Sequence, residues 1–552
     1  MRIEIIRIYK AVHTWTGIVT GLALFIAFYA GAITMFKEPL AHWIAPPPQH
    51  RASLAQTDLL IHQTLAVRPD AAKEFTLHLT DYGNVPARLT WQKSRDDNSP
   101  WSADFAPDGS LQIQQLHRSG LPRFIDDIHR TAGIPGGGEI GEKIMGIVSI
   151  LYAVALVSGV IVLLPSLVKD LFALRLGANL KRMWLDAHNV VGIVSLPFHL
   201  IMALTAVIFG LHDLIYELQD RWIYDGQLRP IIQASIPGSV IKRDDRPAPM
   251  LAPEELLARV RQRAPDFEPV AMQYRNADSQ GAYVRIAGHN PRYLARGMGF
   301  VVLSPVSGDI LSTDYLPGHQ GFWSASVSPF FALHFGSYGG EPVRWAYFFL
   351  GLAGAFLFYS GNLLWIETRR RTDRRHRGPV PQRLATRLMA AGTVGVCLGC
   401  ICGISLTIAA AKWLHGRVGD IDAWHQAIYY ATFLGVIAWA FQRGAARAAG
   451  ELLWFAAAAT AAIPMTTLVT TLFTDLGATT LGVDIVAAVG SLGLVWMVRA
   501  NRRCAIQGHQ QSVWSLASAS ASSRSSYLSE EPAGALEIGG GKEPCDRIGP
   551  SQ

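Results

Sequence analysis

The sequence has little charge and few cysteines for its length. Of its 552 residues, 16% are Asp, Glu, Lys or Arg, against roughly 25% in a soluble chain, while 50% are hydrophobic. This balance predicts a membrane protein. The net charge of +7 is concentrated in short segments, which argues against a nucleic-acid-binding protein. Three of the five cysteines lie in one apolar stretch, so no disulfide framework is indicated.

Eight runs of about 20 apolar residues are long enough to cross a bilayer. They occupy approximately residues 11–36, 142–164, 187–210, 343–366, 388–411, 424–441, 452–473 and 479–498. The first run resembles a secretory signal in its basic start, but it is longer than a signal core and contains His13 and Trp15. We therefore expect a retained helix.

Lys and Arg gather at the start of the chain, between the second and third runs, and between the fourth and fifth runs. Because short basic loops stay in the cytoplasm, both termini are predicted to be cytoplasmic, with anionic lipids as contacts of the basic loops. The runs then group as a first helix (1–36), a hairpin (142–210), a fourth helix (343–366) and an additional four-helix region (388–498).

Two long polar segments, 37–141 and 211–342, remain on the opposite side. Each begins with a helical pattern and continues with alternating strands and a turn, at Asp108-Gly109 in the first and Ser307-Gly308-Asp309 in the second. The predicted fold is therefore an α-helical integral membrane protein of about eight transmembrane helices, with two small α+β domains on the side away from the termini. The segment 504–552 is rich in Ser, Gly and Pro and is predicted to be disordered.

Two histidines lie in the third apolar run. His188 and His199 are 11 residues apart, which returns to within about 20° of the same helix face, about 16 Å along the axis. Ionisable groups within a bilayer are costly and mark functional sites. Two imidazoles stacked along one helix suit two haems, each taking a second histidine from a neighbouring helix. The alternative is that each histidine only hydrogen-bonds a neighbour in a packed bundle.

His13 lies at the same depth as His188 and is predicted to complete the cytoplasmic-side pair. For the outer pair, His199 has two candidate partners, His334 before the fourth run and His129 before the second. We prefer His334, because Phe and Leu side chains surround it and would cover a macrocycle, whereas charged residues flank His129. In that arrangement, His129 contacts haem propionates or substrate, or simply caps a surface helix.

Four stretches together resemble the PepSY-associated transmembrane proteins, over about residues 1–370. They are K-A-V-H-T-W-T-G-I-V-T-G-L, R-M-W-L-D-A-H-N-V-V-G-I-V-S-L-P-F-H-L, A-L-H-F-G-S-Y-G-G and Y-F-F-L-G-L-A-G-A-F-L-F-Y-S-G-N-L-L-W-I-E. That family includes iron-regulated inner-membrane proteins and haem-containing siderophore-iron reductases. The resemblance implies a multi-pass protein of a bacterial inner membrane, with PepSY-like modules in the periplasm, two haem b groups, and electron transfer to a ferric chelate. Residues 388–498 lie outside the four-span pattern.

The function expected from these features is reduction of Fe(III) in a periplasmic siderophore. Oxygen chelates suit hard Fe(III) better than Fe(II), so a one-electron reduction releases the iron. Because no nucleotide-binding or flavin motif is found, a membrane quinol or another membrane reductase must donate the electrons. Two rival functions are a regulator whose PepSY-like units bind peptides without a cofactor, and an iron-chelate permease with broken helices near the midplane.

Overall fold

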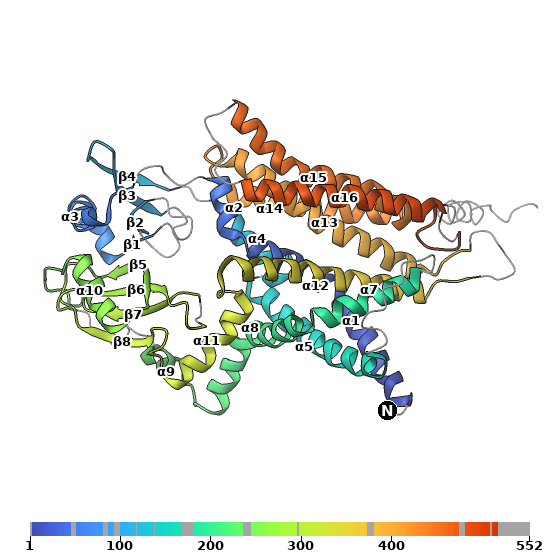
Figure 1. Ribbon diagram of the computed structural model, residues 1–552, viewed down its shortest axis with the longest axis horizontal. Coiled ribbons are helices and arrows are strands. Elements are labelled where there is room, and N and C mark those ends of the chain that lie inside the picture. Colours follow the sequence, from blue (N-terminus) through green and yellow to red (C-terminus); the bar gives the residue numbers. More distant parts are fainter. Residues whose placement is uncertain are drawn as a thin grey trace, which may run out of the picture.

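The computed structural model describes residues 3–45, 51–80, 87–92, 100–116, 119–136, 138–167, 180–235, 244–294, 297–372, 380–473, 481–507 and 510–516. A region of long helices carries a β-sheet at one end, and the N-terminus lies at the other end (Figure 1). We call these two ends the sheet side and the terminal side. Of the tail predicted to be disordered, 504–552, residues 504–507 instead continue the last helix and residues 510–516 are also described. Residues 508–509 and 517–552 lie outside the described residues.

Seven helices among the described residues are long and apolar enough to cross a membrane. They are α1 (Ile3–Thr34), α5 (Gly138–Leu163), α8 (Leu196–Trp222), α12 (Gly340–Thr368), α13 (Leu384–Leu414), α15 (Ala445–Phe473) and α16 (Leu481–Gln507). The sixth predicted span forms α14 (Ile421–Arg443), which is long enough but carries Asp422 and His425 in its first turns and has no stretch as apolar as those of the seven. The chain is thus a mainly helical, multi-pass membrane protein.

The third predicted span is interrupted. A helix α7 (Leu180–Val194) ends just before Ser195, and α8 begins at Leu196 with Pro197 in its first turn. Proline is tolerated there because the first turn of a helix does not use its own N–H groups. The amide of His199 still bonds the Ser195 carbonyl at 3.0 Å, so the interruption is local.

The two polar segments share one antiparallel sheet, in the order β4-β3-β2-β1-β5-β6-β7-β8. The first segment supplies β1 (Glu74–His78), β2 (Leu89–Trp91), β3 (Trp101–Phe105) and β4 (Leu111–Gln115), and the second supplies β5 (Glu268–Arg275), β6 (Tyr283–His289), β7 (Gly299–Leu303) and β8 (Ile310–Tyr315). Both predicted turns are present, and Gly109 and Gly308 take positive φ of 82° and 75° there. Figure 1 shows α3 (Thr57–Val67) and α10 (Pro253–Arg263) on the face away from the long helices.

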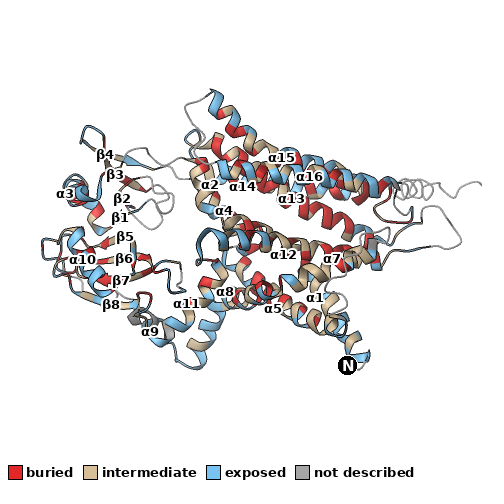
Figure 2. Ribbon diagram, viewed as in Figure 1, coloured by how far each residue is buried: buried red, intermediate tan, exposed pale blue. Residues whose placement is uncertain are grey.

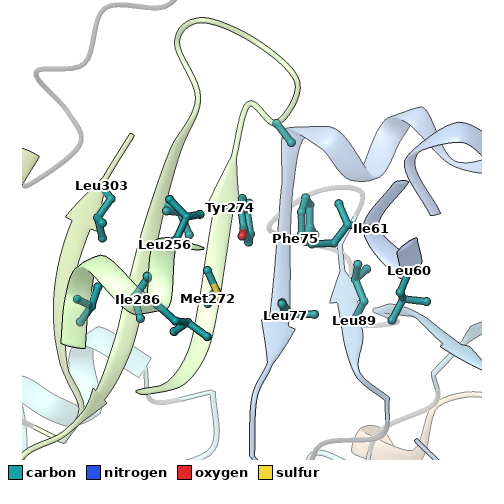
Figure 3. Packing of buried hydrophobic residues seen from close by; sticks show 14 of the residues in the cluster. Leu60, Ile61, Phe75, Leu77, Leu89, Leu256, Met272, Tyr274, Ile286 and Leu303 are labelled. Atoms are coloured by element: carbon teal, nitrogen blue, oxygen red, sulfur yellow. The ribbon is translucent and has the colours of Figure 1, made fainter. Parts of the chain in front are cut away.

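The halves of the sheet join where β1 pairs with β5, with Phe75 opposite Tyr274 and Leu77 opposite Met272. The rings of Phe75 and Tyr274 stack at 4.7 Å between centroids, and both side chains are buried (Figure 3). A single hydrophobic core runs beneath both halves. Pairing in this way covers one edge of each half, and unpaired edges invite aggregation. The sequence patterns had indicated each half but not their union.

The long helices form two groups. In the first, α1 packs against α5 and α12, α5 against α8, and α12 against α7. The second comprises α13 to α16, in which α13 is buried over 78% of its most apolar stretch (Figure 2). Three short helices, α2 (Lys37–Ile44), α4 (Leu121–Thr131) and α11 (Phe322–Phe335), lie on the sheet side. The last two end at Ala132 and Gly336, whose positive φ of 51° and 58° stops each helix.

Candidate functional site

Two histidines from the first helix group form a pair toward the terminal side, which we call the terminal-side pair. His13 on α1 and His188 on α7 have ring centroids 6.2 Å apart and planes at 72°. The Nδ1 of His13 lies 2.8 Å from the Ala155 carbonyl of α5, and that of His188 lies 3.1 Å from the Ser360 hydroxyl of α12. Four helices therefore fix the two rings.

A second pair, the sheet-side pair, lies where the short helices meet the bundle. His129 on α4 and His334 on α11 have ring centroids 6.3 Å apart and planes at 40°. The Nδ1 of His129 lies 2.7 Å from the Ala27 carbonyl of α1, and that of His334 lies 2.7 Å from the Thr205 hydroxyl of α8. The spacing of the rings matches that of the terminal-side pair to 0.1 Å.

The fifth candidate, His199, belongs to neither pair. Its side chain is fully buried beside Phe28, and its Nδ1 lies 2.5 Å from the Tyr152 hydroxyl. Among the described residues, its Nε2 has no hydrogen-bond partner. His334, which the sequence analysis preferred as its partner, lies instead against His129. The difference arises because α11 and α4 are short helices that meet near Thr205, beyond His199 along α8, and the sequence does not specify their depth.

The hydrogen bonds fix which ring nitrogen carries the proton. A carbonyl can only accept, so the Nδ1 atoms of His13 and His129 are the donors. The hydroxyls of Ser360 and Thr205 donate to carbonyls of their own helices, at 2.9 and 2.6 Å, and therefore accept from His188 and His334. In the neutral form of each ring, Nε2 is therefore the unprotonated nitrogen. Histidines that bind metals show this same division of roles, with one nitrogen donating to the protein and the other facing the metal.

The spacing of each pair suits two axial ligands of one iron. A metal–imidazole bond of about 2 Å on either side, with the half-widths of two rings, gives roughly 6 Å between ring centroids. The observed 6.2 and 6.3 Å agree with this distance. Within the described residues, no group of three or more His, Cys, Asp or Glu is placed to hold a bare metal ion. A macrocycle that supplies four ligands of its own needs only the two histidines.

Glycines let the imidazoles approach neighbouring helices closely. A Cβ added to Gly159 would lie 2.8 Å from the His13 ring, and one added to Gly31 would lie 2.7 Å from Nδ1 of His129. Gly354 of α12 faces His199 in the same way, at 3.1 Å. Because real Cβ contacts are longer than the first two distances, any larger residue at Gly159 or Gly31 must displace the facing ring or its helix.

The two pairs lie at different depths. His13 and Ala27, which mark them on α1, are roughly 21 Å apart along the helix at 1.5 Å per residue. That separation fits within a hydrocarbon core of about 30 Å, with one pair toward each surface. Between them, Phe28 packs against Tyr152, Phe198 and Phe358 around His199. The interior is therefore apolar and aromatic.

Comparison with known families accounts for the part of the chain that contains these histidines. The family model described as the PepSY-associated TM region matches residues 11–368. The chain belongs to this family. No curated protein matches the chain. The matched region contains all five candidate histidines, whereas α13 to α16 lie beyond it.

Sequence reasoning found the histidines of this family region but not the groups that orient them. Tyr152, Thr205 and Ser360 are ordinary polar residues within apolar runs, and nothing in their spacing distinguishes them. The carbonyls of Ala27 and Ala155 leave no signal in the sequence at all. Gly354 likewise lies within the fourth apolar run, and only the structure shows that it faces the imidazole of His199.

Proposed function

We propose that this membrane protein transfers electrons through two haem b groups and reduces a ferric siderophore or a related iron chelate. The observation that supports it is the pair of bis-histidine arrangements, each with ring centroids just over 6 Å apart and each ring anchored through Nδ1. Haem held at these positions supplies one-electron redox chemistry when bound. We assign His13 and His188 to one group, and His129 and His334 to the other.

The protein's own residues keep the ligands ready and the site dry. The anchoring hydrogen bonds engage Nδ1 of each ring, leave Nε2 for a metal, and reduce the need for the rings to reorient on binding. Phe28, Phe358 and Tyr152 exclude water between the two depths, where an aqueous path would let protons and ions leak. The order of the pairs on α1 gives an electron route from the terminal side to the sheet side.

The sheet offers a surface for an anionic chelate. By strand alternation, Arg275 and Arg285 lie on the face of the sheet opposite its buried core and α10. Arg285 lies 3.8 Å over the Phe300 ring, which stacks on Tyr315 at 4.7 Å. Arg275 is paired with Glu74 at 2.9 Å, so Arg285 is the cation of this face that would meet a ligand. A cation beside stacked aromatic rings suits an anionic oxygen chelate of Fe(III). Reduction by one electron then weakens the chelate, since Fe(II) binds hard oxygen ligands less tightly.

The Lys and Arg residues at the start of the chain, between the second and third apolar runs and between the fourth and fifth support placing the terminal side in the cytoplasm of a bacterial cell. The sheet would then lie in the periplasm. Electrons would enter at the terminal-side pair from a membrane quinol or another membrane reductase. Acceptor and donor thus lie on opposite sides of the bundle. Such an arrangement moves one negative charge outward for each iron reduced, so the membrane potential, negative inside, favours the transfer.

The decisive experiment is the visible spectrum of the purified protein, with and without dithionite, combined with the haem content per chain. Two low-spin b haems are expected. Changing His13 or His188 to Ala should leave the sheet-side haem, and changing His129 or His334 to Ala should leave the terminal-side haem. His212→Ala is the control, because His212 is an exposed histidine of α8 outside both pairs.

His199→Ala decides between the geometric assignment and the one preferred from the sequence. Two haems should remain in this variant if His129 and His334 form the sheet-side pair. Loss of a haem in His199→Ala, with both retained in His129→Ala, would restore His199 as the ligand. A colourless but folded wild-type protein would rule out the redox function and favour a cofactor-free regulator.

A further inference from the structure

The second helix group, α13 to α16, lies beyond the family region. It nevertheless packs directly on α2 and α4, two short helices of the family region. One buried hydrophobic cluster contains residues of α1, α2, α4 and α13 to α16. In this cluster, Leu121, Ile125 and Ile128 of α4 meet Cys400 of α13 and Tyr429 of α14. Because α4 also carries His129, the second group contacts the helix that supplies one of the sheet-side histidines.

The start of α4 is held by a carboxylate from α14. Asp422 Oδ1 accepts a hydrogen bond of 3.0 Å from the amide of Gly120, the residue that precedes α4. His425 Nδ1, on a fully buried ring, lies 3.5 Å from the same oxygen. A negative charge at a helix N-terminus is favourable, and it satisfies an amide that has no partner within the helix. A Cβ at Gly120 would lie 2.4 Å from that oxygen, so the fit depends on glycine.

The middle and the end of α4 pack against Tyr429, a buried tyrosine of α14. The Tyr429 ring meets Phe124 edge to face at 5.6 Å between centroids. At the other end of α4, a Cβ built on Gly133 would lie 3.1 Å from the Tyr429 hydroxyl. Gly133 has φ of +71° and follows the last turn. Thus α14 contacts both ends of an 11-residue helix, which is short enough to move as one body.

The neighbouring helix α2 is held by the same group. The indole Nε1 of Trp43 lies 2.9 Å from the Thr467 hydroxyl and 3.0 Å from Oδ1 of Asp484. Lys412 places its ammonium 4.7 Å from the centre of the Trp43 ring, and all four side chains are buried. Because α2 packs on α4, this polar cluster limits movement of α4 from its other side.

We propose that the second helix group fixes the geometry of the sheet-side pair, with Asp422 and Tyr429 as positioning residues for His129. The role rests on the proposed function, because it concerns a histidine assigned to haem. A shift of α4 against α14 moves the His129 ring relative to His334 on α11, which has its own anchor on α8. The terminal-side pair has no residue on α4 and stays in place.

Two variants test this role. Gly120→Ala pushes α4 away from Asp422 without changing any charge, and Asp422→Asn weakens the hydrogen bond while preserving the shape. Gly419→Ala is the matched control, because a Cβ at Gly419 meets nothing within 4 Å. All are made in the full-length, haem-loaded protein. Paramagnetic resonance of the oxidised protein reports the geometry of each haem, and the two signals should differ because the pairs have interplanar angles of 40° and 72°.

Both variants should shift the signal and the midpoint potential of the sheet-side haem and leave the terminal-side haem unchanged. Amides in the first turn of α4 should exchange with solvent about tenfold faster, as expected for loss of a charge-assisted hydrogen bond. Retention of the terminal-side haem at full occupancy shows that the bundle has folded. A sheet-side haem unmoved in both variants would overturn the positioning role alone, whereas a wild-type protein without haem would overturn the proposed function and this role together.

Discussion

Replacing Phe75 by alanine tests whether the two polar segments form a single cooperative sheet. Phe75 is 1% exposed and stacks on Tyr274 across the junction of β1 and β5. Removing a buried phenylalanine costs about 3–5 kcal/mol, and the lost aromatic pair accounts for about 0.5–1.5 kcal/mol of that effect. In the full-length protein, this loss should speed amide exchange through opening of the sheet by a factor of about 10² to 10³ or more.

The informative amides are those of β5 and β6, which lie far from Phe75 in sequence but next to it in the sheet. We expect their exchange to accelerate together with that of β1 and β2. Phe322→Ala provides a control of the same chemistry, because Phe322 is 88% exposed at the start of α11. If the change stays within the strands of the first segment, the two segments are independent domains and the reasoning from the shared core fails.

Three further outcomes follow from the contacts described above. Gly31→Ala should remove the sheet-side haem and leave the terminal-side haem. Gly17→Ala on the same helix, where a Cβ meets nothing within 4 Å, should keep both haems. The measurement is the haem content per chain. Trp43→Phe removes the donor facing buried Asp484 and should lower stability by about 1–3 kcal/mol, seen as a lower Tm. Burial lowers the pKa of His289 in the sheet below its usual 6.5, so the unfolded chain binds more protons and stability falls as pH drops through 6.5; replacing it by Gln should flatten that part of the Tm–pH curve.

Local patterns in the sequence predict most of the helices and both halves of the sheet. Long apolar runs are visible because a membrane requires about 20 such residues, and the turns at Gly109 and Gly308 are visible because they need positive φ. Prediction weakens where partners are distant in sequence. The pairing of β1 with β5 depends on complementary edges, and neither strand carries a signal for the other.

The same limit applies to the histidines. His188 and His199 can be located within the third apolar run, and His13 from its depth in the first run, but the break that places the first two on separate helices cannot be predicted from their spacing. The contact between His129 and His334 depends on two short helices, one at the end of each polar segment, that pack on the bundle. The preference for His334 as the partner of His199 uses the apolar or polar residues near each histidine. Those neighbours describe the surroundings of a ring, but they do not determine the distance between two rings.

The junction of β1 and β5 has a consequence for how the protein is made. Two membrane-spanning segments, α5 and the interrupted span formed by α7 and α8, lie between the two strands in the chain. The sheet is therefore completed only after both segments have been inserted and the second polar segment has been delivered to the same side. At about 5–20 residues per second, roughly 190 residues separate the strands by about 10–40 s of synthesis. During that interval β1 presents an open edge, and a chaperone on the sheet side would protect the nascent chain from pairing with the wrong neighbour.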